Sequence, residues 1–273
     1  MTDAAEWQGR VGKSWAREWV RTDRSFEGLN AVLIDRVAAL DPHLILDIGS
    51  GAGATALSLA ERLPSASVLG IDLSDELLEI ARTRAKGFDN CRFETADAAR
   101  WRNSEFVPDT LLSRHGVMFF DDPVGAFSNL AHAAQPRANL VFSCFRDRSL
   151  NPWATEVVEL IANLPAADPL ASGPFAFADP EHVIRILTDA GWDNLAFEPV
   201  DWRYVAGAGD DAVNDAVDFF RNIGPAAPAI AALDDSKRVD ILKKVTAIAE
   251  SHHQDNVVQF DAAAWIVTAI AGR

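Results

Sequence analysis

The stretch LILDIGSGAG at residues 44–53 constrains the fold more than any other part of this sequence. Four apolar residues surround Asp47 in a nearly continuous run, which is typical of a strand buried on both faces of a parallel sheet. A carboxylate in such a strand must be hydrogen-bonded or face a ligand, because burying it unpaired costs several kcal/mol. Glycines at positions 49, 51 and 53 then allow a sharp turn and a close approach to the backbone. The stretch therefore predicts a strand, a tight turn and a bound ligand.

Segments with helical periodicity alternate with candidate strands after this turn. Ser74 is a suitable N-cap for the second helix, and Pro123 opens the third. This alternation indicates the α/β class with a doubly wound, mostly parallel sheet. Strands are expected at 68–72, 91–97, 110–116 and 138–145, and helices at 55–63, 74–87 and 123–135.

The pattern changes after residue 150. Pro- and Ala-rich sequence at 151–180 indicates a helical insertion with a loop, followed by a helix near 181–190. A strand at 195–204, an acidic helical stretch at about 210–252 and two β-prone runs, NVVQF and AAAWIVTAI, complete the chain. At 273 residues, the chain is long enough for one α/β domain with insertions.

Aspartates close the first three predicted strands. Asp47, Asp72 and Asp97 follow one another in this way, and ligands in doubly wound sheets bind at the carboxyl ends of the strands. Asp72 lies about 20 residues after the glycines, where a carboxylate can accept both hydroxyls of a ribose. Each aspartate could instead cap the turn that follows it. Three of them beside a glycine turn favour a ligand with hydroxyls, an amino group and a base.

NAD is one candidate for that ligand. Gly49, Gly51 and Ala54 formally satisfy G-x-G-x-x-[GA], which is weak evidence by itself. Asp47 stands two residues before the first glycine, where its charge would repel a pyrophosphate and attract an ammonium group.

The motifs together resemble the class I S-adenosylmethionine-dependent methyltransferases, in particular bacterial small-molecule enzymes with a methyltransferase domain of type 11 or 25. The resemblance extends over nearly the whole chain and includes the spacing of Trp7, Gly12 and Trp15. It is carried by LDIGSGAGATALSLA, VLGIDLSDELLEIAR, ETADA, SRHGVMFFDDPVGAFSNLAHAAQPRANLVFSCFR, NPW, GPFAFADPEHVIRILTDAGW, IGP and AAAWIVTA.

This resemblance implies a Rossmann-like, seven-stranded sheet whose last strand is antiparallel. It also implies one domain over residues 1–273, with a helical N-terminal cap at 1–40 and a cofactor-binding core at 41–145. The helical insertions at 146–180 and 206–254 would then cover the site of the methyl acceptor.

The resemblance also assigns cofactor contacts, with S-adenosylmethionine as cofactor and S-adenosylhomocysteine as product. The methionine part would contact Asp47, Gly49, Ser50 and Gly51. Asp72 and Leu73 would bind the ribose, Asp97 and Ala98 the adenine, and the backbone carbonyl of Arg114 the amino group.

His115 is the candidate catalytic residue. It follows the fourth predicted strand, where its side chain is expected at the mouth of the site, and imidazole titrates near neutrality. His115 would deprotonate or orient a hydroxyl or amine. The alternative is a histidine bonded to the backbone without proton transfer. Relatives usually carry an aromatic or apolar residue here, so the family does not define its role.

Aromatic residues are the candidates for the acceptor pocket. Trp15 lies with Trp7 and Trp19 on an expected N-terminal helix that would fold over the cofactor. Phe119 and Trp153 would form further walls, and core packing is the alternative use of each ring. Phe175 and Phe177 carry the same two alternatives.

Charge and composition limit the partners. With 25 Lys and Arg against 40 Asp and Glu, the net charge of −15 argues against nucleic acid and against a membrane surface. The polar N-terminus predicts a cytoplasmic protein. Neither Cys91 and Cys144 nor the pair His252 and His253 has the spacing of a metal site, so no metal is expected. The oligomeric state is open, with a homodimer as one option.

The predicted function is methyl transfer to oxygen or nitrogen of a small, partly apolar acceptor, such as an aromatic or polyketide-like compound. Carbon methylation stays open. An NAD-dependent oxidoreductase and a non-catalytic cofactor-binding protein are the alternatives.

Overall fold

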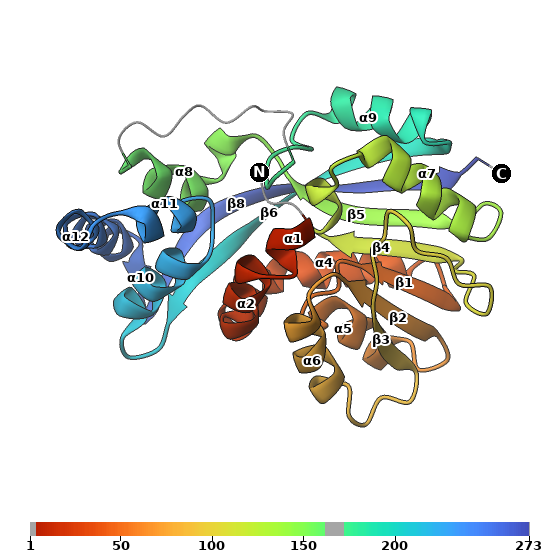
Figure 1. The fold of residues 1–273 in the computed structure, drawn as a ribbon, viewed down its shortest axis with the longest axis horizontal. Helices are drawn as coiled ribbons and strands as arrows, with labels where there is room; N and C mark the ends of the chain where they lie inside the picture. The colour runs from red at the N-terminus through yellow and green to blue at the C-terminus, as the bar shows by residue number, and fades with distance from the viewer. Residues whose placement is uncertain (1–3, 162–171, 273) are drawn as a thin grey trace.

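The computed structural model describes residues 4–161 and 172–272. Its centre is a twisted sheet with strand order β3-β2-β1-β4-β5-β8-β6 (Figure 1). The first five strands are parallel, and β8 runs antiparallel to both β5 and β6. The strands are β1 Leu44–Ile48, β2 Ser67–Asp72, β3 Cys91–Thr95, β4 Thr110–Arg114, β5 Asn139–Phe145, β6 Trp192–Ala208, β7 His253–Gln254 and β8 Val257–Ala271.

This topology confirms the expected doubly wound sheet of seven main strands. The eighth strand, β7, has two residues and pairs only with the start of β8. The order reverses between β1 and β4, so a topological switch point lies beside the glycine turn.

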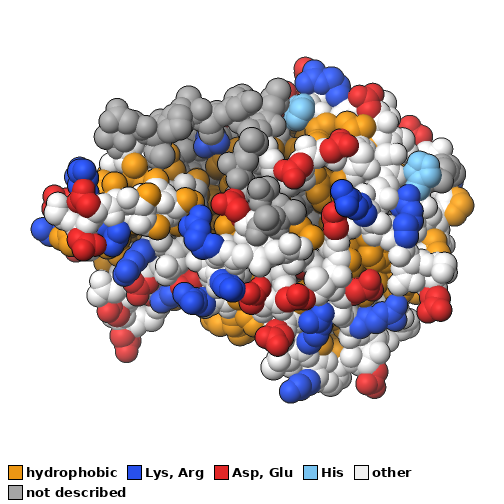
Figure 2. All heavy atoms as spheres, in the orientation of Figure 1, with side chains coloured by type: hydrophobic (Ala, Val, Ile, Leu, Met, Phe, Trp, Pro, Cys, Tyr) orange, Lys and Arg blue, Asp and Glu red, His pale blue; other side chains and the backbone are white. Residues whose placement is uncertain are grey.

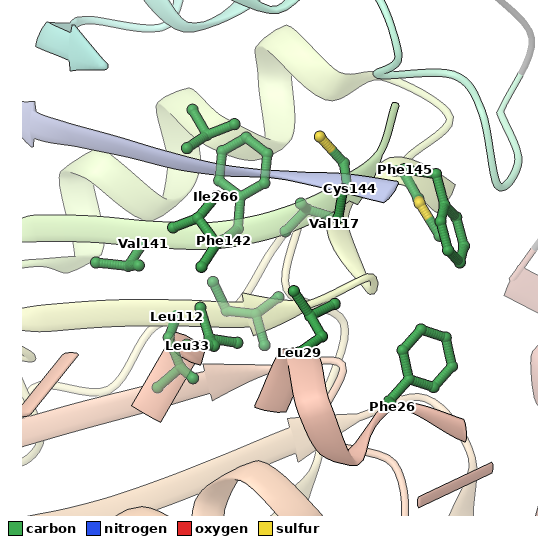
Figure 3. Packing of buried hydrophobic residues seen from close by; sticks show 14 of the residues in the cluster. Phe26, Leu29, Leu33, Leu112, Val117, Val141, Phe142, Cys144, Phe145 and Ile266 are labelled. Carbon is green, nitrogen blue, oxygen red and sulfur yellow. The ribbon is translucent and has the colours of Figure 1, made fainter. Parts of the chain in front are cut away.

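The central strands are buried on both faces, as their apolar sequence predicts. Leu46 lies beside Leu69 of β2 and Leu111 of β4, and all three are fully buried. Figure 3 shows Leu29 and Leu33 below β4 and Phe142 above it, while Phe26 and Phe145 stand at one end of this core. The core therefore continues from the sheet into an aromatic cluster at the carboxyl ends of its strands.

Helices cover both faces of the sheet (Figure 1). On one face, α4 Glu27–Ala38 packs on α5 Ala54–Arg62, with α6 Asp75–Arg84 beside them; on the other, α7 Pro123–Ala133 packs on α9 Pro180–Asp189. Ser74 caps α6 and Pro123 opens α7, as expected, and Asp122 is the N-cap ahead of Pro123. Ser74 Oγ accepts a hydrogen bond from Leu77 N at 3.3 Å, and Asp122 Oδ1 accepts one from Gly125 N at 3.0 Å ahead of Pro123.

The C-terminal half differs from the prediction in two ways. The two β-prone runs form one strand, β8, because β6 pairs with both of them, from Val257 to Ala271, and β5 pairs with the second. The acidic stretch forms three helices, since Gly224 takes a positive φ of 99° and Asp234 caps a new helix. These helices are α10 Ala212–Asn222, α11 Ala227–Ala232 and α12 Asp235–Ser251, and with α8 Pro152–Glu159 they gather at the far ends of β6 and β8 (Figure 1).

The prediction of one N-terminal helix for the three tryptophans was wrong. Trp7, Trp15 and Trp19 lie on three successive short helices: α1 Ala4–Trp7, α2 Arg10–Arg17 and α3 Trp19–Ser25. Gly9 and Glu18 separate them with non-helical backbone angles. The short helices let this segment bend around the open end of the sheet, in front of β4 and β5 in Figure 1.

Candidate functional site

A cavity of about 520 Å³ lies at the carboxyl ends of the parallel strands, which is an ordinary size for a small-molecule site. It is bounded by the glycine turn, the ends of β2 and β4, the N-terminal helices and the segment after α10. The expected site residues that line it are Trp15, Gly49, Ser50, Gly51, Asp72, Leu73, Asp97, Ala98, Arg114, His115, Phe119 and Trp153.

The glycine turn forms the floor of this cavity. Gly49, Gly51 and Gly53 have positive φ angles of 66°, 53° and 85°, which residues other than glycine rarely adopt. At Gly53 a Cβ would also lie 2.8 Å from the ring of Phe93. The alternating glycines of the sequence therefore serve a left-handed turn that exposes the backbone to the cavity.

Asp72 organises this turn. Its Oδ2 accepts a hydrogen bond from Gly51 N at 2.8 Å, and its Oδ1 accepts one from Ser74 N at 2.9 Å. Within the protein, Asp72 thus caps the turn that follows it, as one of the two interpretations of the sequence predicted. Each carboxylate oxygen has a second lone pair, and Asp72 lines the cavity, so it can also accept from a ligand. Burial raises its pKa despite these backbone bonds.

Asp47 lies below the cavity and does not line it. Its side chain is 1% exposed, and Oδ2 has no hydrogen-bond partner among the described residues. Burial raises the pKa of this carboxyl to about 7, although the nearby Arg114 guanidinium opposes the shift. The carboxylate has a backbone hydrogen bond with Ala56, but the ionised form with one oxygen unpartnered is costly, and a cationic group bound nearby would reduce that cost.

The other expected cofactor residues lie along the rim. Asp97 Oδ1 accepts a hydrogen bond from Ala99 N at 2.9 Å, so this aspartate also caps its own turn. The Arg114 side chain turns toward α3, where Nη2 lies 3.5 Å from Asp23 Oδ1. This leaves the Arg114 backbone as the part of the residue available to a ligand.

His115 is held rigidly at the end of β4. Its φ is +61°, an uncommon value for a residue other than glycine. Nδ1 lies 2.8 Å from Ser143 Oγ, while Nε2 is buried without a partner among the described residues. Burial, and secondarily the Arg114 charge, holds its pKa well below the usual value, so the imidazole is neutral at pH 7. Instead of projecting from the mouth as expected, His115 is 7% exposed and lines the buried part of the cavity.

The N-terminal helices form the wall opposite the glycine turn. Trp7 contacts both Trp15 and Phe119, with ring centroids 5.6 and 5.2 Å apart, and all three line the cavity. Gly12 brings α2 against the start of α6: a Cβ there would lie 2.1 Å from Trp7 O and 2.5 Å from Ser74 Oγ. The W-x₄-G-x₂-W spacing thus corresponds to a docked helix pair.

We expect Gly12→Ala to weaken ligand binding in the cavity about tenfold, because the new methyl group would clash with Trp7 O and Ser74 Oγ and displace α2. Calorimetry with S-adenosylhomocysteine measures the affinity. Tryptophan fluorescence measures whether the surroundings of the wall's tryptophans change. Arg17→Ala, at an exposed position of the same helix, is the control and should bind like the unmodified protein. Equal affinities for both variants would show that the contact is not needed.

Several cavity residues were missed by the sequence prediction. Phe26, Phe145 and Tyr204 line the cavity, although they come from a helix junction, the end of β5 and the middle of β6. No spacing rule links such distant positions. Phe175 and Phe177 instead pack in the core, Phe175 against Phe145 at 5.5 Å and Phe177 against Phe142 at 6.1 Å.

The described residues contain no group of three or more His, Cys, Asp or Glu side chains placed to hold a metal ion. His252 is bonded through Nε2 to Glu156 Oε2 at 2.9 Å. Within the same residues, no helix is long and apolar enough to cross a membrane. On the face shown in Figure 2, basic and acidic side chains are interspersed.

The middle of the chain is similar to known methyltransferases. Residues 45–137 match the family model described as a methyltransferase domain. The trans-aconitate 2-methyltransferase of Variovorax paradoxus is 28% identical over 140 residues, which are 51% of this chain and 52% of that protein. The malonyl-[acyl-carrier protein] O-methyltransferase of a Marinomonas species is 26% identical over 142 residues, or 50% and 53% of the two chains. The chain thus spans about half the length of these curated relatives.

Solved structures share the fold over most of the chain. The [4+2]-cyclase SpnF aligns with a TM-score of 0.54 at 17% identity, over 89% of this chain and 80% of that one. A putative methyltransferase from Bacillus halodurans aligns with a TM-score of 0.53 at 13% identity, over 88% and 97%. At such identities the likeness concerns the fold alone.

Proposed function

Because this chain belongs to the class I S-adenosylmethionine-dependent methyltransferases, we propose that it transfers a methyl group from that cofactor to oxygen or nitrogen of a small, uncharged and largely apolar acceptor. The observation that carries the proposal is one cavity that joins the glycine turn and Asp72 to a wall of aromatic side chains.

The residues of the cavity fit the cofactor. An ammonium group above the glycine turn would compensate Asp47, whose Oδ2 lacks a partner among the described residues. Asp72 would accept the ribose hydroxyls with its free lone pairs, and Asp97 with Ala98 would contact the adenine. Gly49, Ser50 and Gly51 offer backbone without a bulky side chain in the way. The bound cofactor would supply an activated methyl group.

The acceptor side of the cavity is lined by aromatic side chains, and the residues that the structure describes there include no free cation. Among the described residues lining the cavity, the Lys and Arg side chains are Arg100, which is mostly exposed beside Asp97, and Arg114, which faces Asp23. A tricarboxylate such as trans-aconitate would therefore lose its hydration without gaining ion pairs.

The protein's main contribution to the reaction is alignment. The aromatic walls would hold the acceptor's nucleophilic atom in line with the methyl group and exclude water. A hydroxyl acceptor must lose its proton, and His115, with a depressed pKa, is a poor base for that step. We therefore propose that His115 orients the acceptor and that the proton leaves to solvent.

A direct test offers methyl-labelled S-adenosylmethionine with 1-naphthol, 1-naphthylamine, 1-naphthoate and trans-aconitate, and measures methylated product by mass spectrometry. We expect transfer to at least one of the two neutral aromatic probes and none to trans-aconitate. Methylation of trans-aconitate while both neutral aromatic probes fail would contradict the proposed acceptor class. A cytoplasmic location, a homodimer and the absence of nucleic-acid partners remain predictions that this assay does not address.

A further inference from the structure

Five aromatic side chains form a closed cage in the cavity, defined here as Phe26, His115, Phe145, Trp153 and Tyr204. Each ring lies next to the following one around the cage, with centroid distances of 5.1, 4.1, 5.0, 4.6 and 5.7 Å. All five line the cavity. The last contact, between Tyr204 and Phe26, closes the cage, and Phe26 also contacts Phe145 across it at 6.0 Å. The five rings therefore pack against one another and form one wall of the acceptor site.

His115 gives this cage its one imidazole, and Ser143 determines where the ring carries its proton. Ser143 is fully buried, and His115 Nδ1 is the partner that the described residues give to its hydroxyl. If Nδ1 were protonated and donated to Oγ, two buried groups would lack a partner among the described residues: the hydroxyl proton of Ser143 and the lone pair of Nε2. Donation from Ser143 to Nδ1 leaves the Nε2–H group alone in that state. Ser143 therefore donates to Nδ1, and the single proton of the neutral imidazole is on Nε2.

In the described part of the chain, the Nε2–H group is a buried donor without an acceptor. It is enclosed by the rings of Phe26 and Phe145, and the left-handed backbone at His115 holds it there. An oxygen of a ligand in the cavity, which His115 and both rings line, would satisfy it on reaching Nε2. A quaternary ammonium, which aromatic cages otherwise favour, would meet the positive end of the N–H bond.

We propose that the cage binds a neutral aromatic-sized acceptor and selects it through a hydrogen bond from His115 Nε2–H to an acceptor oxygen. This inference rests on the proposed function, because it describes the acceptor part of the same site. It makes His115 a specificity-determining residue and Ser143 the residue that positions it.

The first test is the tautomer. Long-range ¹⁵N–¹H correlation spectra of histidine-labelled protein, with the His115 signals assigned by their loss in His115→Gln, distinguish Nδ1–H from Nε2–H. We expect the Nε2–H form in the wild type between pH 6 and 8, and a mixture of forms in Ser143→Ala. An Nδ1–H ring or a protonated ring in the wild type would overturn the proposal.

The second test is selectivity in the protein saturated with S-adenosylhomocysteine. Four probes of similar size are compared by ligand-observed NMR: acetophenone, ethylbenzene, benzoate and phenyltrimethylammonium. We expect acetophenone to bind about fivefold tighter than ethylbenzene, as one hydrogen bond allows, and tighter than either ion. The preference should disappear in His115→Phe and persist in part in His115→Gln, which keeps an N–H donor.

His132→Gln is the matched control, because His132 lies on the exposed face of α7 and is bonded to Ser128 O. It should retain the full preference for acetophenone. Tightest binding of phenyltrimethylammonium, or an unchanged preference in His115→Phe, would refute the selection by His115. Failure of S-adenosylhomocysteine to bind at all would instead contradict the proposed function, so the two failures are distinguishable.

Discussion

Replacing Asp72 by alanine is expected to reduce the affinity for S-adenosylmethionine about 100-fold, because hydrogen bonds to a charged group contribute roughly 1.5–3 kcal/mol each. The substitution removes the proposed acceptor of both ribose hydroxyls. It also releases the backbone N–H groups of Gly51 and Ser74, so the glycine turn loses its anchor. Calorimetric titration of the variant measures the loss directly.

Two further variants separate charge from turn geometry. Asp72→Asn keeps one acceptor oxygen for the backbone but loses the charge, and should fall between the wild type and Asp72→Ala. Asp75→Ala is the neighbouring control, since Asp75 bonds to Thr95 Oγ1 and does not line the cavity. Binding by Asp72→Ala within threefold of the wild type would mean that Asp72 serves only the turn.

Asp47→Asn is expected to stabilise the cofactor-free protein at pH 8 while weakening cofactor binding. The folded-state pKa of Asp47 is about 7, above its ordinary value of 3.8, because burial disfavours the ionised form. Between these two pH values the folded protein holds a proton that the unfolded chain has released, so stability falls as pH rises. Above pH 7 the penalty levels off at no more than about 4 kcal/mol.

The asparagine variant avoids this penalty, so its melting temperature at pH 8 should exceed that of the wild type by about 5 °C. The difference should shrink as the pH is lowered toward 4. Its affinity for S-adenosylmethionine should fall at least tenfold, because the proposed partner of the ammonium group is lost. Thermal unfolding across this pH range checks the first effect and calorimetry the second.

Asp89→Asn is the control for Asp47→Asn, because it makes the same chemical change at an exposed position. It should change neither the pH dependence nor the binding. If Asp47→Asn melted below the wild type at pH 8, the ionised carboxylate would have to be satisfied by the protein itself.

Local sequence pattern predicted the sheet core well because the physical cause is local. The apolar run around Asp47 and the three glycines define a buried strand and a left-handed turn within ten residues. The same applies to Ser74, which caps α6, and to Pro123, which opens α7, because both roles depend on the next few residues alone. These features place the cofactor side of the cavity.

The acceptor side could not be predicted in the same way. The cage brings Phe26, Phe145 and Tyr204 together from elements more than fifty residues apart in sequence, through the antiparallel return of β8. The role of Asp47 also needed the structure, since the sequence showed a carboxylate but not that it lies beneath the cavity. Ser143, which positions His115, gave no signal in the sequence because it is an ordinary strand residue until β4 and β5 pair.

The most direct test of the central claim is calorimetric titration of the unmodified protein with S-adenosylmethionine, S-adenosylhomocysteine and NAD. Saturable one-to-one binding of the first two, with no measurable binding of NAD, is the predicted result. Binding of NAD without either methionine compound would contradict the account and move Asp72 into the ribose site of an oxidoreductase.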